Sequence, residues 1–359
     1  MSFQQVSIKN FRAIESLEMD NIKQVNLLTG KNNCGKTSVL EAIFLLAGMS
    51  NPHLAVIVHN LRGLVLNDDK DFSYLFHKFD FSRHPSVVGK LKSQKRQLDI
   101  EPDYSDSTGT VEQVRELDEP VGNKSLSSTG IPMDVPGGLT FYFTVDGRPF
   151  HTKVKIPRAS PERVGIQFAS GYKESLRASF TNPMTIMTSL YPRLEAVLIR
   201  KELGGAIDVL REIEPDLQDI KLGVEGMIYA DIAGIERLTP IHLMGDGIIK
   251  ILALLTAILE MRDGVLLIDE IENGLHYSAL VPLWKAIFKM ASASNVQLFI
   301  ATHSYECIDA MADVYRESGM GEDFISLFRI EQDEGGRHYA VQYKASTLLV
   351  GIERNFEVR

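Results

Sequence analysis

The chain has 359 residues, of which 44% are hydrophobic and 24% are charged, a balance typical of a globular rather than a disordered protein. Its net charge of −9 and isoelectric point of about 5.6 exclude a dedicated basic nucleic-acid-binding domain, although they leave room for local basic patches. The two cysteines, Cys34 and Cys307, cannot form a disulfide framework, and the longest apolar stretch, residues 247–259, is too short to cross a bilayer. We therefore expect a soluble, cytoplasmic protein that does not insert into a membrane.

The first fifty residues predict a strand–loop–helix unit. Short apolar clusters separated by polar turns indicate strands in the first thirty residues, the last of them at residues 25–28. A glycine-containing loop begins at Gly30, and apolar residues with helical spacing follow over residues 38–49.

The middle of the chain has a different character. A basic run at residues 90–96 is followed by an acidic stretch rich in Ser and Gly, and we expect residues 90–129 to form a peripheral excursion. Apolar residues on either side of Asp146-Gly147 predict a β-hairpin over residues 139–156. Residues 182–214 are expected to be largely helical, and residues 220–238 to form short strands.

The last third alternates between predicted helices and strands, which is typical of a parallel sheet with helices on both faces. We expect helices over residues 247–259 and 277–290, strands over residues 264–268 and 296–301, and two edge strands with a short helix after residue 323. The predicted α/β head is therefore split into residues 1–89 and 238–359. Residues 90–237 are an inserted α+β arm with a mobile loop, a β-hairpin, a helical arm and strands that partly join the head.

Residues 30–37, GKNNCGKT, fit the phosphate-loop pattern G-x-x-x-x-G-K-[ST] without a gap. Backbone N–H groups of such a loop converge on phosphate oxygens, and the following helix points its positive end at the same anion. Lys36 would reach the β- and γ-phosphates of ATP, and the Thr37 hydroxyl would ligate Mg²⁺. The residues that we expect to contact nucleotide here are Gly30, Asn32, Asn33, Cys34, Gly35, Lys36, Thr37 and Ser38.

Cys34 in this loop has two interpretations. A small residue is needed there, or the thiol acts as a redox sensor because a helix N-terminus lowers its pKa.

Two further groups are expected beside the phosphate loop. Asp269 and Glu270 end an apolar strand, whose carboxyl end would face the ligand crevice of a parallel sheet. We expect Asp269 to hold Mg²⁺ and Glu270, pointing to the opposite side, to polarise the attacking water. His303 follows the next strand and would lie near the γ-phosphate.

The phosphate loop, the Asp-Glu strand, Thr302-His303-Ser304 and the opening IKNFR at residues 8–12 resemble the ABC-type ATPases of the SMC, RecF and OLD families. The resemblance implies a P-loop NTPase head that combines a mixed-sheet lobe with a parallel sheet flanked by helices. Lys36 and Thr37 match the Walker A positions, Asp269 and Glu270 the Walker B positions, and His303 the switch histidine. The catalytic residues implied are Glu270, His303 and Lys36.

The same resemblance assigns a signature motif to Gly245, Asp246 and Gly247, which open a helix. In the family this motif reaches across a dimer to the partner's γ-phosphate, and the Gly-Asp-Gly form resembles the OLD variant. Asp246 as an ordinary helix N-cap is the alternative. Residues 272–276 resemble a D-loop at the dimer seam, and a Q-loop is expected near residues 75–81.

OLD nucleases also carry a Toprim nuclease domain, for which too few residues follow His303, so we expect any nuclease to be a separate polypeptide. The leading hypothesis is a homodimeric, ATP-gated switch in DNA repair or in defence against phages and plasmids, with a separately encoded effector. Alternatives are the motor subunit of an ABC transporter, a P-loop kinase of small molecules, and a DNA-binding module with little hydrolysis. The DNA-binding patch of the last alternative would consist of Lys90, Lys92, Lys95, Arg96, Lys153, Lys155, Arg158 and Arg163.

Overall fold

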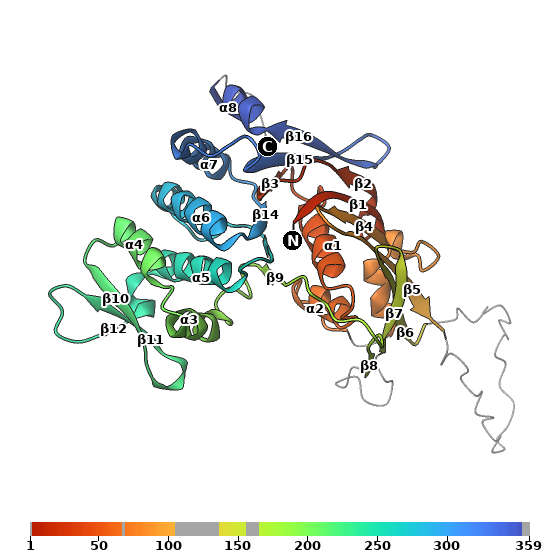
Figure 1. The fold of residues 1–359 in the computed structure, drawn as a ribbon, viewed down its shortest axis with the longest axis horizontal. Coiled ribbons are helices and arrows are strands. Elements are labelled where there is room, and N and C mark those ends of the chain that lie inside the picture. Colours follow the sequence, from red (N-terminus) through yellow and green to blue (C-terminus); the bar gives the residue numbers. More distant parts are fainter. Residues whose placement is uncertain (1, 67–68, 105–135, 156–164, 354–359) are drawn as a thin grey trace, which may run out of the picture.

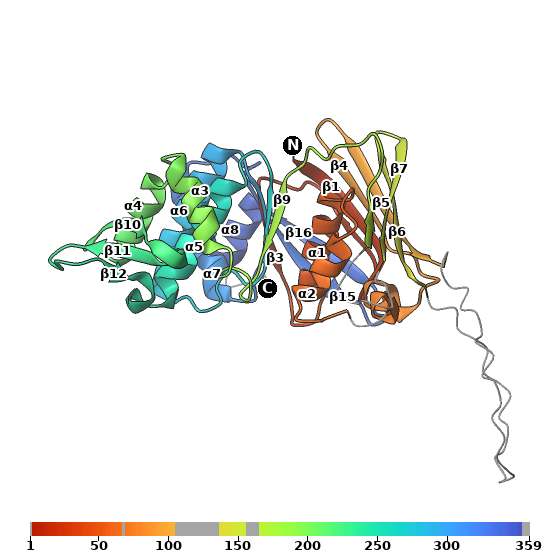
Figure 2. The same ribbon diagram turned by 90° about the horizontal axis from the view of Figure 1, so that it is seen from below.

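The computed structural model describes residues 2–66, 69–104, 136–155 and 165–353. Its elements form layers, which Figures 1 and 2 show from two directions: an antiparallel sheet, helix α1 (Lys36–Ala47), a largely parallel sheet, and a further layer of helices. The two sheets thus enclose α1, whose residues from Ser38 to Ala47 are all buried.

The antiparallel sheet has the strand order β2-β1-β4-β5-β6-β7-β8. Its strands are β1 (Phe3–Phe11), β2 (Ile14–Met19), β4 (Ser86–Leu91), β5 (Lys95–Asp103), β6 (Gly138–Val145), β7 (Arg148–Lys155) and β8 (Gly165–Gln167). The predicted hairpin is confirmed as β6 and β7. Asp146 and Gly147 join them with φ angles of 49° and 80°, because the tight turn between two twisted strands requires left-handed backbone.

The second sheet has the order β16-β15-β3-β14-β13-β9, and all of its pairs are parallel except β15 with β16. Its strands are β3 (Val25–Thr29), β9 (Ala178–Thr181), β13 (Val265–Ile268), β14 (Gln297–Ala301), β15 (Ile325–Gln332) and β16 (His338–Lys344). Alternate residues face opposite layers: Leu266 packs among the outer helices, whereas Leu267 packs toward α1. Both faces are buried, as the apolar strands predicted.

The remaining helices cover the outer face of this sheet or border α1. They are α2 (Leu54–Asn60), α3 (Leu190–Ile199), α4 (Gly204–Ile213), α5 (Asp246–Glu260), α6 (Leu280–Ser294), α7 (Tyr305–Ser318) and α8 (Ala345–Glu353). A small sheet of β10 (Leu217–Leu222), β11 (Ile228–Ile232) and β12 (Thr239–Pro240) lies beyond α4 and α5 (Figure 1). Among the described residues, we find no helix with the length and apolar character that crossing a membrane requires.

Two expectations about individual strands are wrong. Residues 95–103 are not peripheral, because β5 lies between β4 and β6 inside the antiparallel sheet, while residues 105–130 lie outside the described ranges. Two edge strands were expected after residue 323, but only β16 is an edge strand, because β15 pairs with β3 as well as with β16. The expected boundary between residues 89 and 90 falls within β4, and the division of the chain into head and arm stays a prediction.

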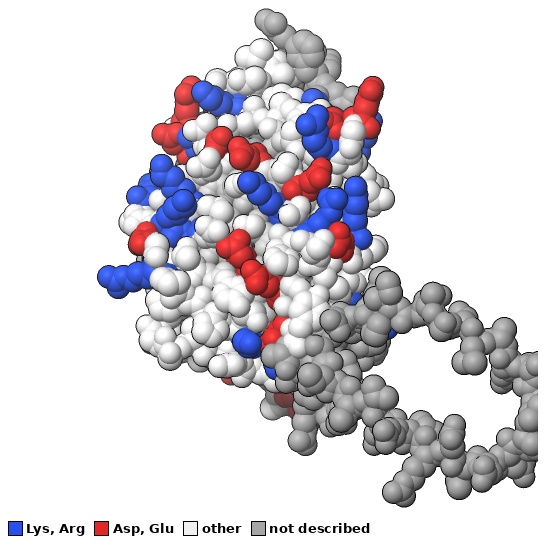
Figure 3. Space-filling model, turned by 90° about the vertical axis from the view of Figure 1, so that its right-hand side faces the viewer, with Lys and Arg blue, Asp and Glu red and all other residues white. Residues whose placement is uncertain are grey.

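The basic patch is also contradicted at Arg96. Its side chain is fully buried by the alternation of β5, pairs with Glu174 and donates to the Tyr172 hydroxyl at 3.0 Å. Lys153 lies 3.0 Å from the carboxylate of Asp103. On the side of the molecule that carries β5 to β7, basic and acidic side chains are intermixed (Figure 3), while Arg158 and Arg163 lie outside the described residues.

Candidate active site

The phosphate loop connects the end of β3 to the start of α1 and depends on two glycines. Gly30 has a φ of 131°, and a Cβ atom there would lie 2.3 Å from the carbonyl oxygen of Ile330, so no other residue fits. Gly35, with a φ of 98°, occupies the left-handed region directly before Lys36, the first residue of α1. The N-terminus of a twelve-residue helix therefore faces the loop, as an anion site requires.

A cavity of about 620 Å³, here called the phosphate-loop cavity, opens beside this loop. Its lining residues are Ala13, Asn32, Asn33, Gly35, Lys36, Thr37, Ser38, Arg62, Asp269, Glu270, Ala301, Thr302 and His303. The structure thus brings the phosphate loop, the acidic pair and the histidine to one place. Gly30 and Cys34 do not line the cavity, although the Gly30 carbonyl oxygen accepts a hydrogen bond from Lys36 Nζ at 2.8 Å.

The Cys34 side chain is buried beside the loop. Burial raises the pKa of its thiol, against the opposing charge of Lys36, which favours a small packing residue over a redox sensor.

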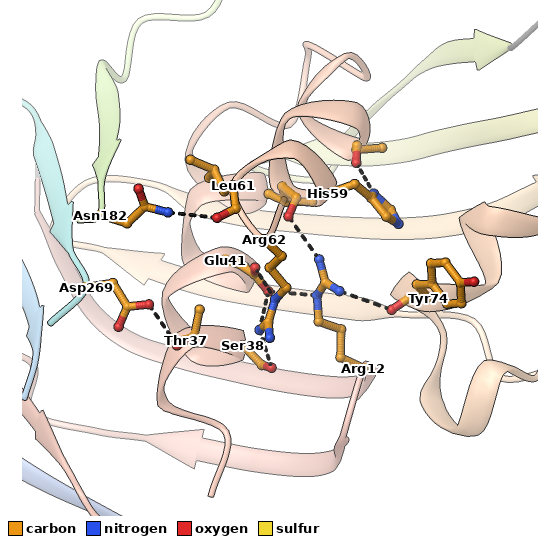
Figure 4. Close-up of polar contacts among 12 residues, drawn as sticks. Arg12, Thr37, Ser38, Glu41, His59, Leu61, Arg62, Tyr74, Asn182 and Asp269 are labelled. Atoms are coloured by element: carbon orange, nitrogen blue, oxygen red, sulfur yellow. Dashed lines mark hydrogen bonds and ion pairs between the residues drawn. The ribbon is translucent and has the colours of Figure 1, made fainter. Parts of the chain in front are cut away.

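Thr37 and Asp269 meet across the cavity. The Thr37 hydroxyl donates to Asp269 Oδ2 at 2.8 Å (Figure 4). Burial raises the pKa of Asp269, and the nearby carboxylates of Glu270 and Glu41 raise it further. A hydroxyl and a half-buried carboxylate in such negative surroundings fit Mg²⁺, which binds one or two protein oxygens and completes its coordination with phosphates and water. No cluster of three or more His, Cys, Asp or Glu within the described ranges offers a different metal site.

Asp269 and Glu270 both line the phosphate-loop cavity, whereas strand alternation predicted that they point to opposite sides. Strand alternation does not extend to them, because β13 ends at Ile268 and Glu270 has left-handed backbone with a φ of 51°. The Glu270 carboxylate accepts a hydrogen bond from Asn273 Nδ2 at 3.1 Å, which holds its side chain in the turn that follows.

Comparison with known proteins gives consistent matches. Residues 1–129 match the family described as an AAA ATPase domain, and residues 187–309 match the family described as an AAA domain, putative AbiEii toxin, Type IV TA system. The chain is 24% identical to an ATP/GTP phosphatase of Helicobacter pylori over 92% of this chain and 93% of that protein. It is 39% identical to the DNA replication and repair protein RecF of Pseudoalteromonas translucida, over 26% of this chain and 27% of that protein.

Among solved structures, the fold resembles an SMC head bound to the C-winged helix domain of ScpA. The TM-score is 0.52 at 13% identity, with 96% of this chain and 98% of that chain covered. In its matched families and in its fold, the chain is similar to the ABC-type ATPases of the SMC and RecF group.

The expected signature residues, Gly245, Asp246 and Gly247, lie outside the phosphate-loop cavity of their own chain. Helix α5 begins at Asp246 and its N-cap is Gly245, so the alternative that Asp246 is the N-cap is wrong. A Cβ atom built on Gly245 or Gly247 would meet no atom of the described residues within 4 Å. The start of α5 is therefore open to close approach by another molecule.

Arg62 is a residue of the phosphate-loop cavity that the sequence did not reveal. It follows α2, donates to Ser38 Oγ at 3.2 Å and forms an ion pair with Glu41 at 2.7 Å (Figure 4). The Glu41 carboxylate, which is fully buried, also pairs with Arg12 at 2.7 Å. Although burial opposes it, hydrogen bonding to Glu41 raises the pKa of Arg62, which keeps a fixed positive charge at the cavity.

Asn182 is a second residue that the sequence did not reveal. It follows β9 directly and lies beside Asp269, whereas residues 77–79, within the expected Q-loop neighbourhood, line a separate flanking cavity of about 640 Å³. Asn182 Nδ2 donates to the Leu61 carbonyl oxygen at 2.8 Å (Figure 4), and its Oδ1 accepts the Thr185 N–H at 2.9 Å. It thereby links the loop that carries Arg62 to the segment that leads into α3.

Proposed function

We propose that this member of the SMC- and RecF-like ATPases hydrolyses ATP in a site that two copies complete together. The observation that carries the proposal is the separation of two anion-binding helix ends. The N-terminus of α1 opens on the phosphate-loop cavity, while the unobstructed N-terminus of α5 lies outside it. A second, symmetry-related copy would bring its α5 to this cavity, so that ATP closes the dimer and hydrolysis reopens it.

The roles within the cavity follow from charge and reach. Lys36 and the loop N–H groups would bind the β- and γ-phosphates, and Arg62 adds a second positive charge held by Glu41. Thr37 and Asp269 would hold Mg²⁺, which neutralises charge on the phosphates. Glu270 would take a proton from the attacking water while the water oxygen forms a bond to the γ-phosphorus. The bond between the γ-phosphorus and the oxygen that bridges it to the β-phosphate breaks, which releases ADP and phosphate.

The flanking cavity provides room for the nucleoside. It adjoins the phosphate-loop cavity through Ser38 and Arg62, and Tyr74 and Phe79 line it as an edge-to-face aromatic pair with ring centroids 5.6 Å apart. Aromatic faces of this kind bind bases by stacking without reading their edges.

We place the biological role in DNA repair or in defence against phages and plasmids. The RecF name of several relatives supports the first setting, and the AbiEii toxin named by the matched family supports the second. In either setting, closure would move the inserted arm, residues 90–237, against DNA or a separately encoded effector such as a nuclease. An OLD-like identity rests on the Gly245-Asp246-Gly247 signature and is part of this proposal.

Mixing two inactive variants tests the shared site. Lys36→Ala removes phosphate binding, and Gly247→Asp places a carboxylate where the partner's phosphate would lie. Gly247 tolerates the change, because its backbone is not left-handed and a Cβ atom there meets nothing within 4 Å. Each variant alone should be inactive. An equimolar mixture should regain ATPase activity, because one of the two sites in each mixed dimer combines an intact loop with an intact signature. A mixture that stays inactive while mixed dimers form would contradict the proposal.

A further inference from the structure

We propose that Glu272 is a positioning residue that fixes the imidazole ring of His303 and directs its Nε2 atom toward the phosphate-loop cavity. The inference rests on the proposed function, because His303 is one of the groups expected to meet the γ-phosphate or the attacking water. It assigns Glu272, which the D-loop resemblance placed at the dimer seam, a role within its own chain.

One carboxylate oxygen of Glu272 contacts both the backbone N–H and the ring of His303. Glu272 Oε1 accepts the backbone N–H of His303 at 3.0 Å and lies 3.1 Å from its ring Nδ1. His303 lines the cavity and Glu272 does not, so the carboxylate lies behind the ring. The Glu272 side chain is 11% exposed, whereas that of His303 is 53% exposed. A largely buried group therefore holds a side chain that solvent would otherwise leave free to rotate.

The carboxylate itself is anchored. The turn that carries it is tied to the end of β14, because the N–H of Ile271 donates to the Ala301 carbonyl oxygen at 3.3 Å. The second oxygen, Glu272 Oε2, is buried and has no hydrogen-bond partner among the described residues. Burying a carboxylate oxygen without a hydrogen-bond partner costs free energy, and the favourable contact of the other oxygen with His303 has to offset that cost.

This arrangement sets the chemistry of the ring. An ionised carboxylate only accepts hydrogen bonds, so Nδ1 must carry the hydrogen and, in the neutral ring, Nε2 keeps its lone pair. Nε2 can then accept a hydrogen bond from water or, once protonated, donate one to phosphate. Glu272 stabilises the ring in both states without touching the nucleotide, as the acid of a hydrolase triad orients its histidine.

Turnover measurements on four full-length variants test the inference. Glu272→Ala should lower kcat by about ten- to a hundredfold with little change in ATP affinity, and Glu272→Gln, which keeps a neutral acceptor, should lose less. In the His303→Ala background, Glu272→Ala should cost nothing further, because Glu272 acts through that ring. The matched control is Glu306→Gln, which changes a carboxylate in the first turn of α7 that accepts from the Ser304 hydroxyl at 2.8 Å instead. Full additivity of the two alanine substitutions would overturn the inference.

A second readout does not depend on turnover. Nitrogen-15 spectra of labelled histidines, with His303→Ala to assign the signal, report which ring nitrogen carries hydrogen. We expect the Nδ1–H form of His303 in the native protein and a shift toward the Nε2–H form in Glu272→Ala. An unchanged tautomer would overturn the inference. If His303→Ala keeps full activity but the tautomer shifts, the proposed role of His303 fails while the positioning by Glu272 stands.

Discussion

Neutralising Glu41 should destabilise the protein strongly. Its carboxylate is fully buried and lies between two guanidinium groups, those of Arg12 and Arg62, at 2.7 Å from each. Glu41→Gln keeps the shape of the side chain and removes the charge, which deprives both cations of the carboxylate that they share. Breaking a buried ion pair in this way typically costs about 3–5 kcal/mol.

We expect a value near the lower limit, about 3 kcal/mol, because the amide oxygen of glutamine still accepts a hydrogen bond. For a chain of 359 residues this corresponds to a fall in Tm of about 4 °C. Arg62 should also be released from the cavity, so that ATP affinity falls together with Tm.

Thermal unfolding of the nucleotide-free protein measures the effect. The control is Glu195→Gln, the same chemical change at an exposed position of α3, which should leave Tm nearly unchanged. Arg12→Met should cost less in the Glu41→Gln background than in the native protein, because there it removes an unpaired charge. A fall in Tm no larger than that of the Glu195→Gln control would refute the reasoning.

Three further predictions concern single contacts. Burial lowers the pKa of His59 from 6.5 to about 4, so the unfolded chain takes up a proton that the folded chain refuses, and the free energy of unfolding should fall by about 3 kcal/mol from pH 7 to pH 4. Urea titrations should find this loss reduced in His59→Leu. Asn182→Ala removes the 2.8 Å bond to the Leu61 carbonyl oxygen and should cost about 1–2 kcal/mol, measured by thermal unfolding, with a further loss of kcat. An unaltered Tm would contradict that bridge. Lys250→Met breaks the 3.1 Å bond from α5 to the Asn273 carbonyl oxygen and should lower kcat but not ATP affinity, whereas substituting an exposed lysine of α6 should do neither.

The parts of the site that could be predicted are those formed by residues adjacent in the sequence. The phosphate loop lies within eight residues, so its strand, turn and helix are set by local pattern, and Gly30 and Gly35 take the left-handed conformations that their types favour. The apolar strand before Asp269 and Glu270 predicts where these acids lie. It does not predict the direction of their side chains, because that depends on where the strand ends.

Residues brought to the site by packing alone carry no such pattern. Arg62 reaches the cavity because α2 ends beside α1, and Asn182 because β9 joins the edge of the sheet next to β13. Neither pairing has a signal in sequence spacing. The prediction for Arg96 was wrong for the opposite reason, because a local pattern was misleading. A basic run suggested an exposed surface, but the alternation of β5 turns this one side chain into the core, where it pairs with Glu174.

Light scattering on the Glu270→Gln variant tests the shared ATP site most directly. With ATP and Mg²⁺ bound but not hydrolysed, the molar mass should double from the 40.1 kDa of one chain, and it should return to that value with ADP or with the additional change Lys36→Ala. A particle that keeps the mass of one chain while holding one ATP per chain would contradict the account.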